Sequence, residues 1–204
     1  MASLSDIGPE KKPDIRIVGS LKLNAFSTPV DETFADQLRV AAGNRPILLA
    51  ASTHSPEEQI LLKASQEVVR AGYPHLLIIA PRHSDRSQDI ARLMPQAAHR
   101  SKNQIPLSGD NHFLADSFGE MSSLVTAADI VILGGSFVPK GGHNPLEIAA
   151  LSTPLITGPS QFKNKVEFDT LQQYGQCITV KDGAALVKQL TIWLEALRSD
   201  GSAI

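Results

Sequence analysis

The stretch that decides the fold is residues 130–147, which read IVILGGSFVPKGGHNPLE. Its first four residues form an unbroken apolar run typical of a buried parallel strand, and Leu146 opens a segment with apolar residues at helical spacing. Asn144 is a good N-cap, and Pro145 stands where the first helical residue belongs, because its missing N–H costs nothing there. The stretch therefore predicts a glycine-rich loop that joins a strand to a helix.

This loop carries the groups that a phosphate or a sugar needs. Gly141 and Gly142 let a ligand approach the backbone closely, and the open amides at a helix start favour an anion. His143 and Asn144 add polar side chains, and the carboxylate of Glu147 can accept two hydrogen bonds from a ribose or sugar diol. The alternative is a glycine-rich turn that only changes the chain direction. Three polar side chains beside the glycines favour a ligand site.

A second apolar run, residues 47–50, predicts another buried strand. The helix after it is expected to begin with a capping box formed by Ser55 and Glu58, with Pro56 at its first position. Polar residues stand between the strand and this helix, namely Ser52, Thr53 and His54. They belong to the carboxyl end of a strand, which is the ligand edge of open α/β sheets.

A third apolar run, residues 76–80, ends just before Arg82. A guanidinium there can donate two parallel hydrogen bonds to a phosphate or to a cytosine carbonyl. The alternative is a surface arginine paired with Asp85 or Asp89. The position at the end of a strand favours the binding role.

Strand and helix patterns alternate over the remaining chain. A short strand is expected at residues 15–19, and Asp182 is expected to cap the last helix. The other expected elements are a helix over 31–42, short strands near 98–100 and 113–115, a helical face with Met121 and Leu124, a strand at 154–157, a helix with Val166, Leu171 and Tyr174 that ends at Gly175, and a strand at 177–180. Six or more such steps predict an α/β fold with a doubly wound, Rossmann-like parallel sheet.

Composition narrows the function classes. The chain has 204 residues, of which 42% are hydrophobic and 20% charged, which suits one well-buried domain preceded by a polar leader or linker at residues 1–13. A net charge of −2 gives no reason to expect nucleic acid as a partner. The single cysteine, Cys177, excludes an internal disulfide and is expected to be a core thiol. No run approaches the ~20 apolar residues of a membrane span, so no transmembrane segment is expected.

Residues 134–147, together with the run Pro-Leu-Ile-Thr-Gly-Pro at 154–159, resemble the C-terminal half of the 3-deoxy-D-manno-octulosonic acid (Kdo) transferases. These glycosyltransferases of the GT-B fold move Kdo from CMP-Kdo to lipid A precursors in lipopolysaccharide biosynthesis. Their C-terminal domain binds the donor. The resemblance covers about residues 15 to 195 and implies that residues 14–204 form a donor-binding domain that needs no cofactor.

The resemblance also marks two further residues. In the family, an Asp-x-x-Gly-Glu segment lies beside the nucleotide; it matches residues 116–120 and makes Glu120 a candidate ribose or base contact. The alternative is a carboxylate that only favours a helix start. Where the family usually reads Gly-Pro-His-Thr-Phe-Asn-Phe, residues 158–164 read GPSQFKN. Ser160 therefore replaces a histidine, and Lys163, which can meet the donor carboxylate as a point charge, replaces an asparagine.

Transfer from a CMP donor requires that the departing phosphate be held. Backbone amides at Gly141–Gly142 and Ser52–Thr53, with Arg82, are expected to do so without a metal, because the sequence has no Asp-x-Asp pair and no His/Cys cluster at ligand spacing. In the family the base is a glutamate of the N-terminal acceptor domain, which is expected to be missing here. The catalytic residues are thus left open, and the chain alone is expected to bind donor and turn over little. A cytoplasmic location is expected, peripheral to the inner membrane through the other half.

Two other functions remain open at this stage. A GT-B transferase for another nucleotide sugar, such as a UDP-linked one, shares the glycine-rich loop and Glu147. A non-catalytic nucleotide-binding module predicts binding without transfer. A preference for cytidine over uridine nucleotides separates the first interpretation from the second.

Overall fold

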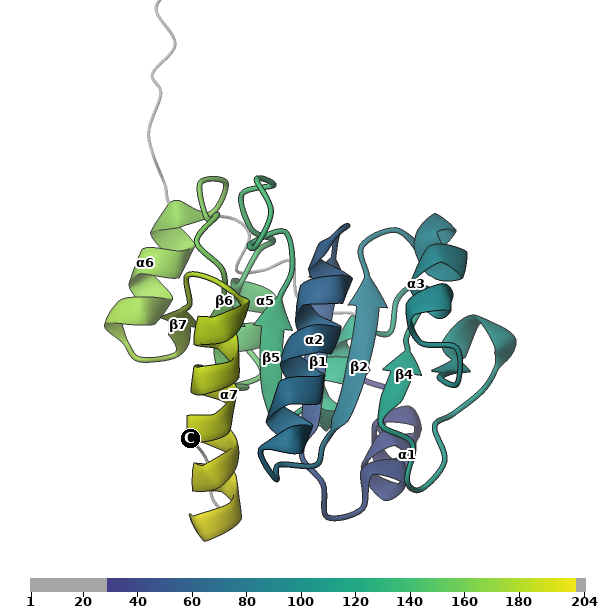
Figure 1. Cartoon of the computed structure of the whole chain (residues 1–204). Coiled ribbons are helices and arrows are strands. Elements are labelled where there is room, and N and C mark those ends of the chain that lie inside the picture. The colour runs from purple at the N-terminus through teal and green to yellow at the C-terminus, as the bar shows by residue number, and fades with distance from the viewer. Residues whose placement is uncertain (1–28, 201–204) are drawn as a thin grey trace, which may run out of the picture.

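The computed structural model describes residues 29–200, so the expected leader and the expected strand at 15–19 lie outside the described residues. Seven strands form one parallel sheet in the order β3-β4-β2-β1-β5-β6-β7 (Figure 1). The strands are β1 (Ile47–Thr53), β2 (Leu76–Pro81), β3 (Ala98–His99), β4 (His112–Leu114), β5 (Ile130–Leu133), β6 (Leu155–Thr157) and β7 (Cys177–Thr179). The predicted α/β fold with a doubly wound parallel sheet is confirmed.

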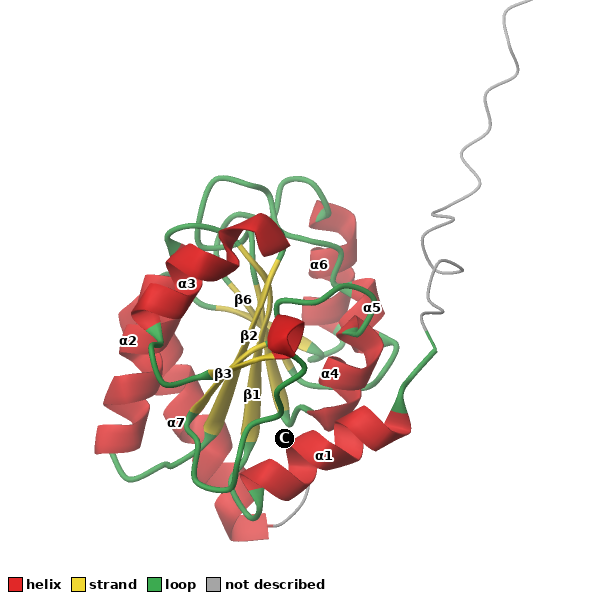
Figure 2. Ribbon diagram, turned by 90° about the vertical axis from the view of Figure 1, so that its right-hand side faces the viewer, coloured by secondary structure: helices red, strands yellow, loops and turns green. Residues whose placement is uncertain are grey.

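Helices cover both faces of the sheet, as Figure 2 shows. One face is covered by α1 (Glu32–Ala42), α4 (Met121–Ala127), α5 (Leu146–Ala149) and α6 (Lys165–Gln173); the other is covered by α2 (Glu57–Arg70), α3 (Ser87–Leu93) and α7 (Gly183–Asp200). Two short 3-10 turns, η3 (Ser84–Arg86) and η4 (Arg100–Lys102), complete the described chain. None of the helices within residues 29–200 is both long and apolar enough to cross a membrane.

The central position of β1 in the sheet explains why its first five residues, 47–51, are all apolar. Its side chains alternate between the two faces of the sheet. Ile47, Leu49 and Ala51 therefore pack toward α1 and α4, whereas Leu48 and Ala50 pack toward α2 and α7. A strand buried on both faces cannot use polar residues on either, so the unbroken apolar run is the signature of this position.

The sheet order reverses at β1. This strand pairs with β2 on one side and with β5 on the other, and all three run parallel. The chain therefore winds outward in opposite directions from β1, and in open α/β sheets ligands bind beyond the carboxyl ends of the strands at such a point. The loops that follow β1, β2 and β5 meet at this point, and they contain most of the predicted site residues.

Helix caps were predicted with mixed success. Asp182 accepts a hydrogen bond from the Ala185 amide at 2.8 Å, so the predicted cap of α7 is confirmed. Asp31, predicted only as the first residue of a helix, is the N-cap of α1 and accepts a hydrogen bond from the Phe34 amide. The capping box at the start of α2 is wrong. That helix begins at Glu57 with no side-chain cap, because the carboxylate of Glu58 turns inward to other partners.

Two further helices differ in detail from their predictions. The helix α5 begins at Leu146 and lasts only four residues, with Asn144 Oδ1 accepting from the Leu146 amide at 3.2 Å. On α6, Leu171 is buried as the pattern predicts. The buried aromatic residue of this helix is Phe168, whereas Val166 and Tyr174 are both exposed. Of the three residues that the sequence pattern assigned to this helix, only Leu171 is therefore buried. Exposed apolar residues such as the other two are common on protein surfaces.

Candidate functional site

Three histidines come together where the loops after β1, β2 and β5 meet. The ring of His54, just after β1, lies parallel to that of His143 with centroids 5.0 Å apart, and the two Nε2 atoms are 2.8 Å apart. The His83 ring, just after β2, meets the His54 ring edge-on at 5.7 Å. The fold therefore brings together two predicted site residues that are 89 positions apart in the chain.

The surroundings of these rings are cationic. Burial, together with the charges of His54, Arg82 and Lys163, lowers the pKa of His143 to about 4. Burial and the nearby charges of His83, Lys140 and Arg86 also lower the pKa of His54. Basic side chains that lie this close together make it harder to protonate one another. An anion that binds among them offsets this repulsion, so the arrangement favours an anion.

Two glycines let the loop after β5 pass close to the other loops. A Cβ on Gly134 would lie 2.7 Å from the Thr53 Cα, inside the contact distance of two carbon atoms. Gly135 has a φ of +68°, and a Cβ there would lie 3.2 Å from the His143 ring. The His143 ring can therefore lie close to the backbone of Gly135, because glycine has no side chain to prevent this approach.

The buried carboxylate of Glu57 ties two of these loops together. Its oxygens accept four backbone N–H groups, from His54 after β1 and from Gly135, Ser136 and Phe137 after β5, at 2.8–3.0 Å. Sequence reasoning missed this residue, because it treated the two glutamates of α2 only as a helix start. A pair of glutamates directly after the polar end of a buried strand was the available signal.

Glu58, the neighbour of Glu57, anchors the loop after β2. It accepts two hydrogen bonds from the Arg86 guanidinium, at 2.8 and 3.0 Å, and one from the Thr53 hydroxyl at 2.8 Å. Burial opposes ionisation, but these hydrogen bonds keep the pKa of Glu58 below its usual value. Thr53 is fully buried, and its hydroxyl points to Glu58 rather than to solvent. Ser52 is half-buried and has a φ of +56°.

Two of the four backbone amides expected to hold a departing phosphate, those of Gly141 and Gly142, are engaged within the protein. Gly141 N donates to Ser160 Oγ at 3.0 Å, and Gly142 N donates to Gly135 O at 2.8 Å. The expectation that both amides are open is thus wrong for this structure. Ser160, which stands where the resembled family has histidine, supplies the acceptor for one of them. A role of the two glycines beside a ligand stays a prediction.

Arg82, Glu147 and Lys163 are exposed at this edge of the molecule. Within residues 29–200, Arg82 forms no ion pair with Asp85 or Asp89; the latter pairs with Arg92 instead. The charge of Arg82 acts on His143, and so does that of Lys163. Next to Lys163, the buried Asn164 donates its Nδ2 to the Gly142 carbonyl at 2.9 Å. The family pattern suggests an asparagine at position 163; in this chain the asparagine stands one position later, at 164, and supports the loop after β5.

Glu120 is placed differently from the other candidates. Its carboxylate accepts hydrogen bonds from the Arg100 guanidinium, at 2.9 Å from Nε, and from the Ser117 hydroxyl. Although burial opposes ionisation, these contacts keep the pKa of Glu120 low. Arg100 also lies 4.2 Å above the Phe34 ring. The structure thus gives Glu120 protein partners and does not bring it into contact with the histidines; its role in binding stays a prediction.

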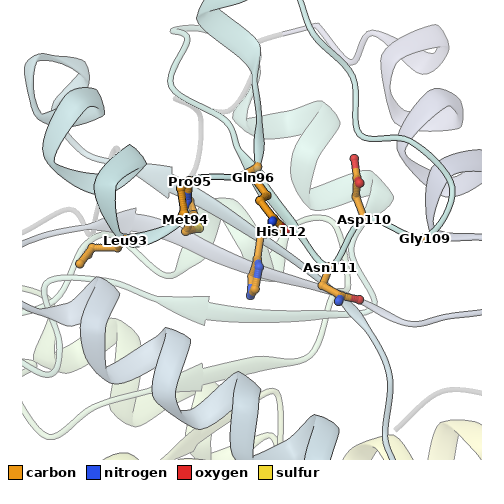
Figure 3. Close-up of a pocket in the computed structure, with 9 residues that line it drawn as sticks. Leu93, Met94, Pro95, Gln96, Gly109, Asp110, Asn111 and His112 are labelled. Carbon is orange, nitrogen blue, oxygen red and sulfur yellow. The ribbon is translucent and has the colours of Figure 1, made fainter.

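A cavity of about 290 Å³ lies at the opposite, amino edge of the sheet, where α3 ends and β4 begins (Figure 3). It is lined by residues such as Met94, Asn111 and His112, and by none of the predicted site residues. A second cavity, of about 410 Å³, lies between α2 and α7 beside Phe137 and again contains no predicted site residue. Neither of these two cavities therefore belongs to the candidate site. In the part of the chain described, no group of three His, Cys, Asp or Glu side chains is arranged to hold a metal.

Comparison with known proteins gives these observations a family context. No family model matches the chain. Among curated proteins, it is 38% identical over 157 residues to a 3-deoxy-D-manno-octulosonic acid transferase of Haemophilus influenzae, with 74% of this chain and 36% of that protein aligned. It is 31% identical over 183 residues to the enzyme of the same name from Rickettsia conorii, with 88% and 39% aligned. The chain is homologous to part of the Kdo transferases. It spans less than half the length of these relatives.

Solved structures show which part of a Kdo transferase the chain resembles. It matches the crystal structure of the C-terminal CMP-Kdo binding domain of WaaA from Acinetobacter baumannii with a TM-score of 0.72 and 28% identity, covering 82% of this chain and 90% of that one. A spinosyn rhamnosyltransferase, SpnG, matches with a TM-score of 0.50 and 16% identity over 39% of its length, which reflects the fold alone. The predicted likeness to the C-terminal domain of a GT-B glycosyltransferase is confirmed.

Proposed function

We propose that this chain is the donor-binding half of a Kdo transferase and binds CMP-Kdo at the carboxyl edge of its sheet. The observation that carries the proposal is the likeness to the C-terminal CMP-Kdo binding domain of WaaA, which extends over 90% of that domain. In this proposal an acceptor half completes the enzyme and presents a lipid A precursor. The assembled enzyme then acts in lipopolysaccharide biosynthesis, on the inner face of the inner membrane.

The arrangement of charges suits the departing group of this reaction. As the bond between Kdo and CMP breaks, negative charge develops on the phosphate, and cationic groups fixed in advance stabilise it. Arg82 and Lys163 supply such charges, and the charges of both act on His143. The amides of Gly141 and Gly142 already donate hydrogen bonds within the protein, so in this proposal the phosphate is bound chiefly by side chains.

The nucleoside is assigned to the start of α5. Glu147 lies in the first turn of this helix, is exposed, and forms no hydrogen bond within residues 29–200. A free carboxylate can accept two hydrogen bonds from the hydroxyls of a ribose. The base that activates the acceptor hydroxyl is assigned to the other half of the enzyme, so this chain alone binds the donor and turns over little.

Calorimetric titration with CMP and with UMP tests the proposal. A monophosphate on one open domain should bind weakly, with a Kd of about 10 µM to 1 mM, and CMP should bind more tightly than UMP. Arg82→Ala and Glu147→Ala should each weaken CMP binding tenfold or more. Arg92→Ala and Glu32→Ala, which change exposed residues on α3 and α1, are the matched controls and should leave it unchanged.

The outcomes separate the candidate functions. A preference for UMP would indicate a transferase for a UDP-linked sugar. Cytidine binding without transfer, when a Kdo transferase acceptor half is supplied, would indicate a non-catalytic module. If neither nucleotide binds at millimolar concentration, this chain does not bind donor by itself and the proposal is refuted.

A further inference from the structure

The geometry of the histidine pair limits how many protons it can hold. His54 and His143 face each other through Nε2 atoms 2.8 Å apart. One Nε2 must carry a proton and the other must accept it, because two N–H groups cannot point at each other at this distance. The pair can therefore consist of two neutral rings, or of one imidazolium and one neutral ring joined by a charge-assisted hydrogen bond. It takes up one additional proton and titrates as a unit.

The charged groups that face the pair come from several elements and are mostly cationic. Those that influence it are Arg82 and His83 after β2, Arg86 in η3, Lys140 in the loop after β5, Lys163 before α6 and Glu58 on α2. Glu58 is bound by Arg86 and Thr53, and the neighbouring Glu57 is bound by four amides. Burial and the cationic neighbours keep the pKa of His143 at about 4 and lower that of His54. The free pair is therefore neutral at neutral pH.

We propose that His54 and His143 form one proton-binding unit that becomes cationic when a phosphate or phosphodiester group binds beside Arg82 and His83. An anion at this position offsets the repulsion that opposes protonation, and the imidazolium attracts the anion in return. Binding of the anion and uptake of the proton thus strengthen each other by the same factor. The inference rests on the proposed function only in naming a cytidine phosphodiester as the ligand, since any anion of this shape has the same effect.

Ring nitrogen NMR of the full chain, titrated between about pH 5 and about pH 8, tests the inference. Two probes are used, sulfate and cytidine 5′-methylphosphate, and neither of them titrates in this range. Either probe should raise the apparent pKa of the pair by one unit or more. A shift of one unit corresponds to a tenfold change in affinity of the phosphodiester across the titration. The pKa of His112, a half-buried histidine at the amino edge of the sheet, should not change (Figure 3).

A pair of variants separates charge from shape. The double variant His54→Asn/His143→Asn keeps polar side chains at both positions but neither can be protonated, so the affinity for cytidine 5′-methylphosphate should lose most of its pH dependence. His112→Asn is the matched control and should retain it. The inference is refuted if neither probe changes the pKa of the pair, or if the pH dependence survives unchanged in the double variant. If sulfate raises the pKa but no cytidine compound binds, the proton-binding unit is supported and the proposed donor is not.

Discussion

The carboxylate of Glu57 offers a direct test of how the carboxyl edge is held together. Glu57 is 0% exposed; its Oε1 accepts the amides of Ser136 and Phe137, and its Oε2 accepts those of His54 and Gly135. Glu57→Gln preserves the shape but replaces one oxygen by an NH₂ group that points at two N–H donors. Two hydrogen bonds to a charged acceptor are lost, each contributing about 1.5–3 kcal/mol. The free energy of unfolding should therefore fall by about 3 kcal/mol or more.

Urea unfolding followed by the fluorescence of Trp193 and by circular dichroism measures this loss. Glu32→Gln is the control, because Glu32 is an exposed glutamate in the first turn of α1. It should cost no more than about 0.3–1 kcal/mol, the usual contribution of a carboxylate at a helix start. A Glu57→Gln variant whose stability lies within about 1 kcal/mol of the wild type would refute this account of the four hydrogen bonds.

Three further changes follow from contacts in the structure. Gly134→Ala places a Cβ 2.7 Å from the Thr53 Cα, so it should destabilise the fold by about 1–3 kcal/mol in the same unfolding assay; a neutral effect would show that the two loops separate easily. Asp182→Ala removes the acceptor for the Ala185 amide and should cost about 1 kcal/mol, measurable as a lower melting temperature; an unchanged melting temperature would contradict the cap. Arg86→Ala should destabilise the protein above about pH 4.5, where Glu58 is ionised in both states. The difference from wild type should shrink as the pH falls through the lowered pKa of Glu58; a difference independent of pH would contradict the role of this pair.

The parts of the fold that sequence reasoning predicted share a physical cause. Both β1 and β5 are covered on both faces, so β5 and the first five residues of β1 are all apolar and are easily recognised. The cap formed by Asp182 was also readable, because a cap needs only its local backbone. Once parallel strands are predicted, topology alone places the loops after β1, β2 and β5 at one edge of the sheet.

The parts that were not predicted depend on contacts between distant segments. A glutamate in the first turn of a helix looks the same in sequence whether it faces water or, like Glu57, accepts amides from a loop 80 residues away. The amides of Gly141 and Gly142 looked open because their partners, Ser160 and the Gly135 carbonyl, are found only when the loop is folded. The ion pair between Arg100 and Glu120 likewise joins two segments whose proximity no local pattern indicates.

The buried sulfur of Cys177 has a practical consequence for experiments on this chain. It is the single cysteine of the sequence, it is 3% exposed, and burial raises the pKa of its thiol to about 12. Because the thiolate is the reactive form, the native protein should be almost inert to maleimide dyes near neutral pH. A cysteine placed on α1 by Val40→Cys, at a position that is 79% exposed, would then carry a fluorophore at one defined place. The wild-type chain thus already provides the background needed to follow, by energy transfer, how this domain approaches a separately supplied acceptor half.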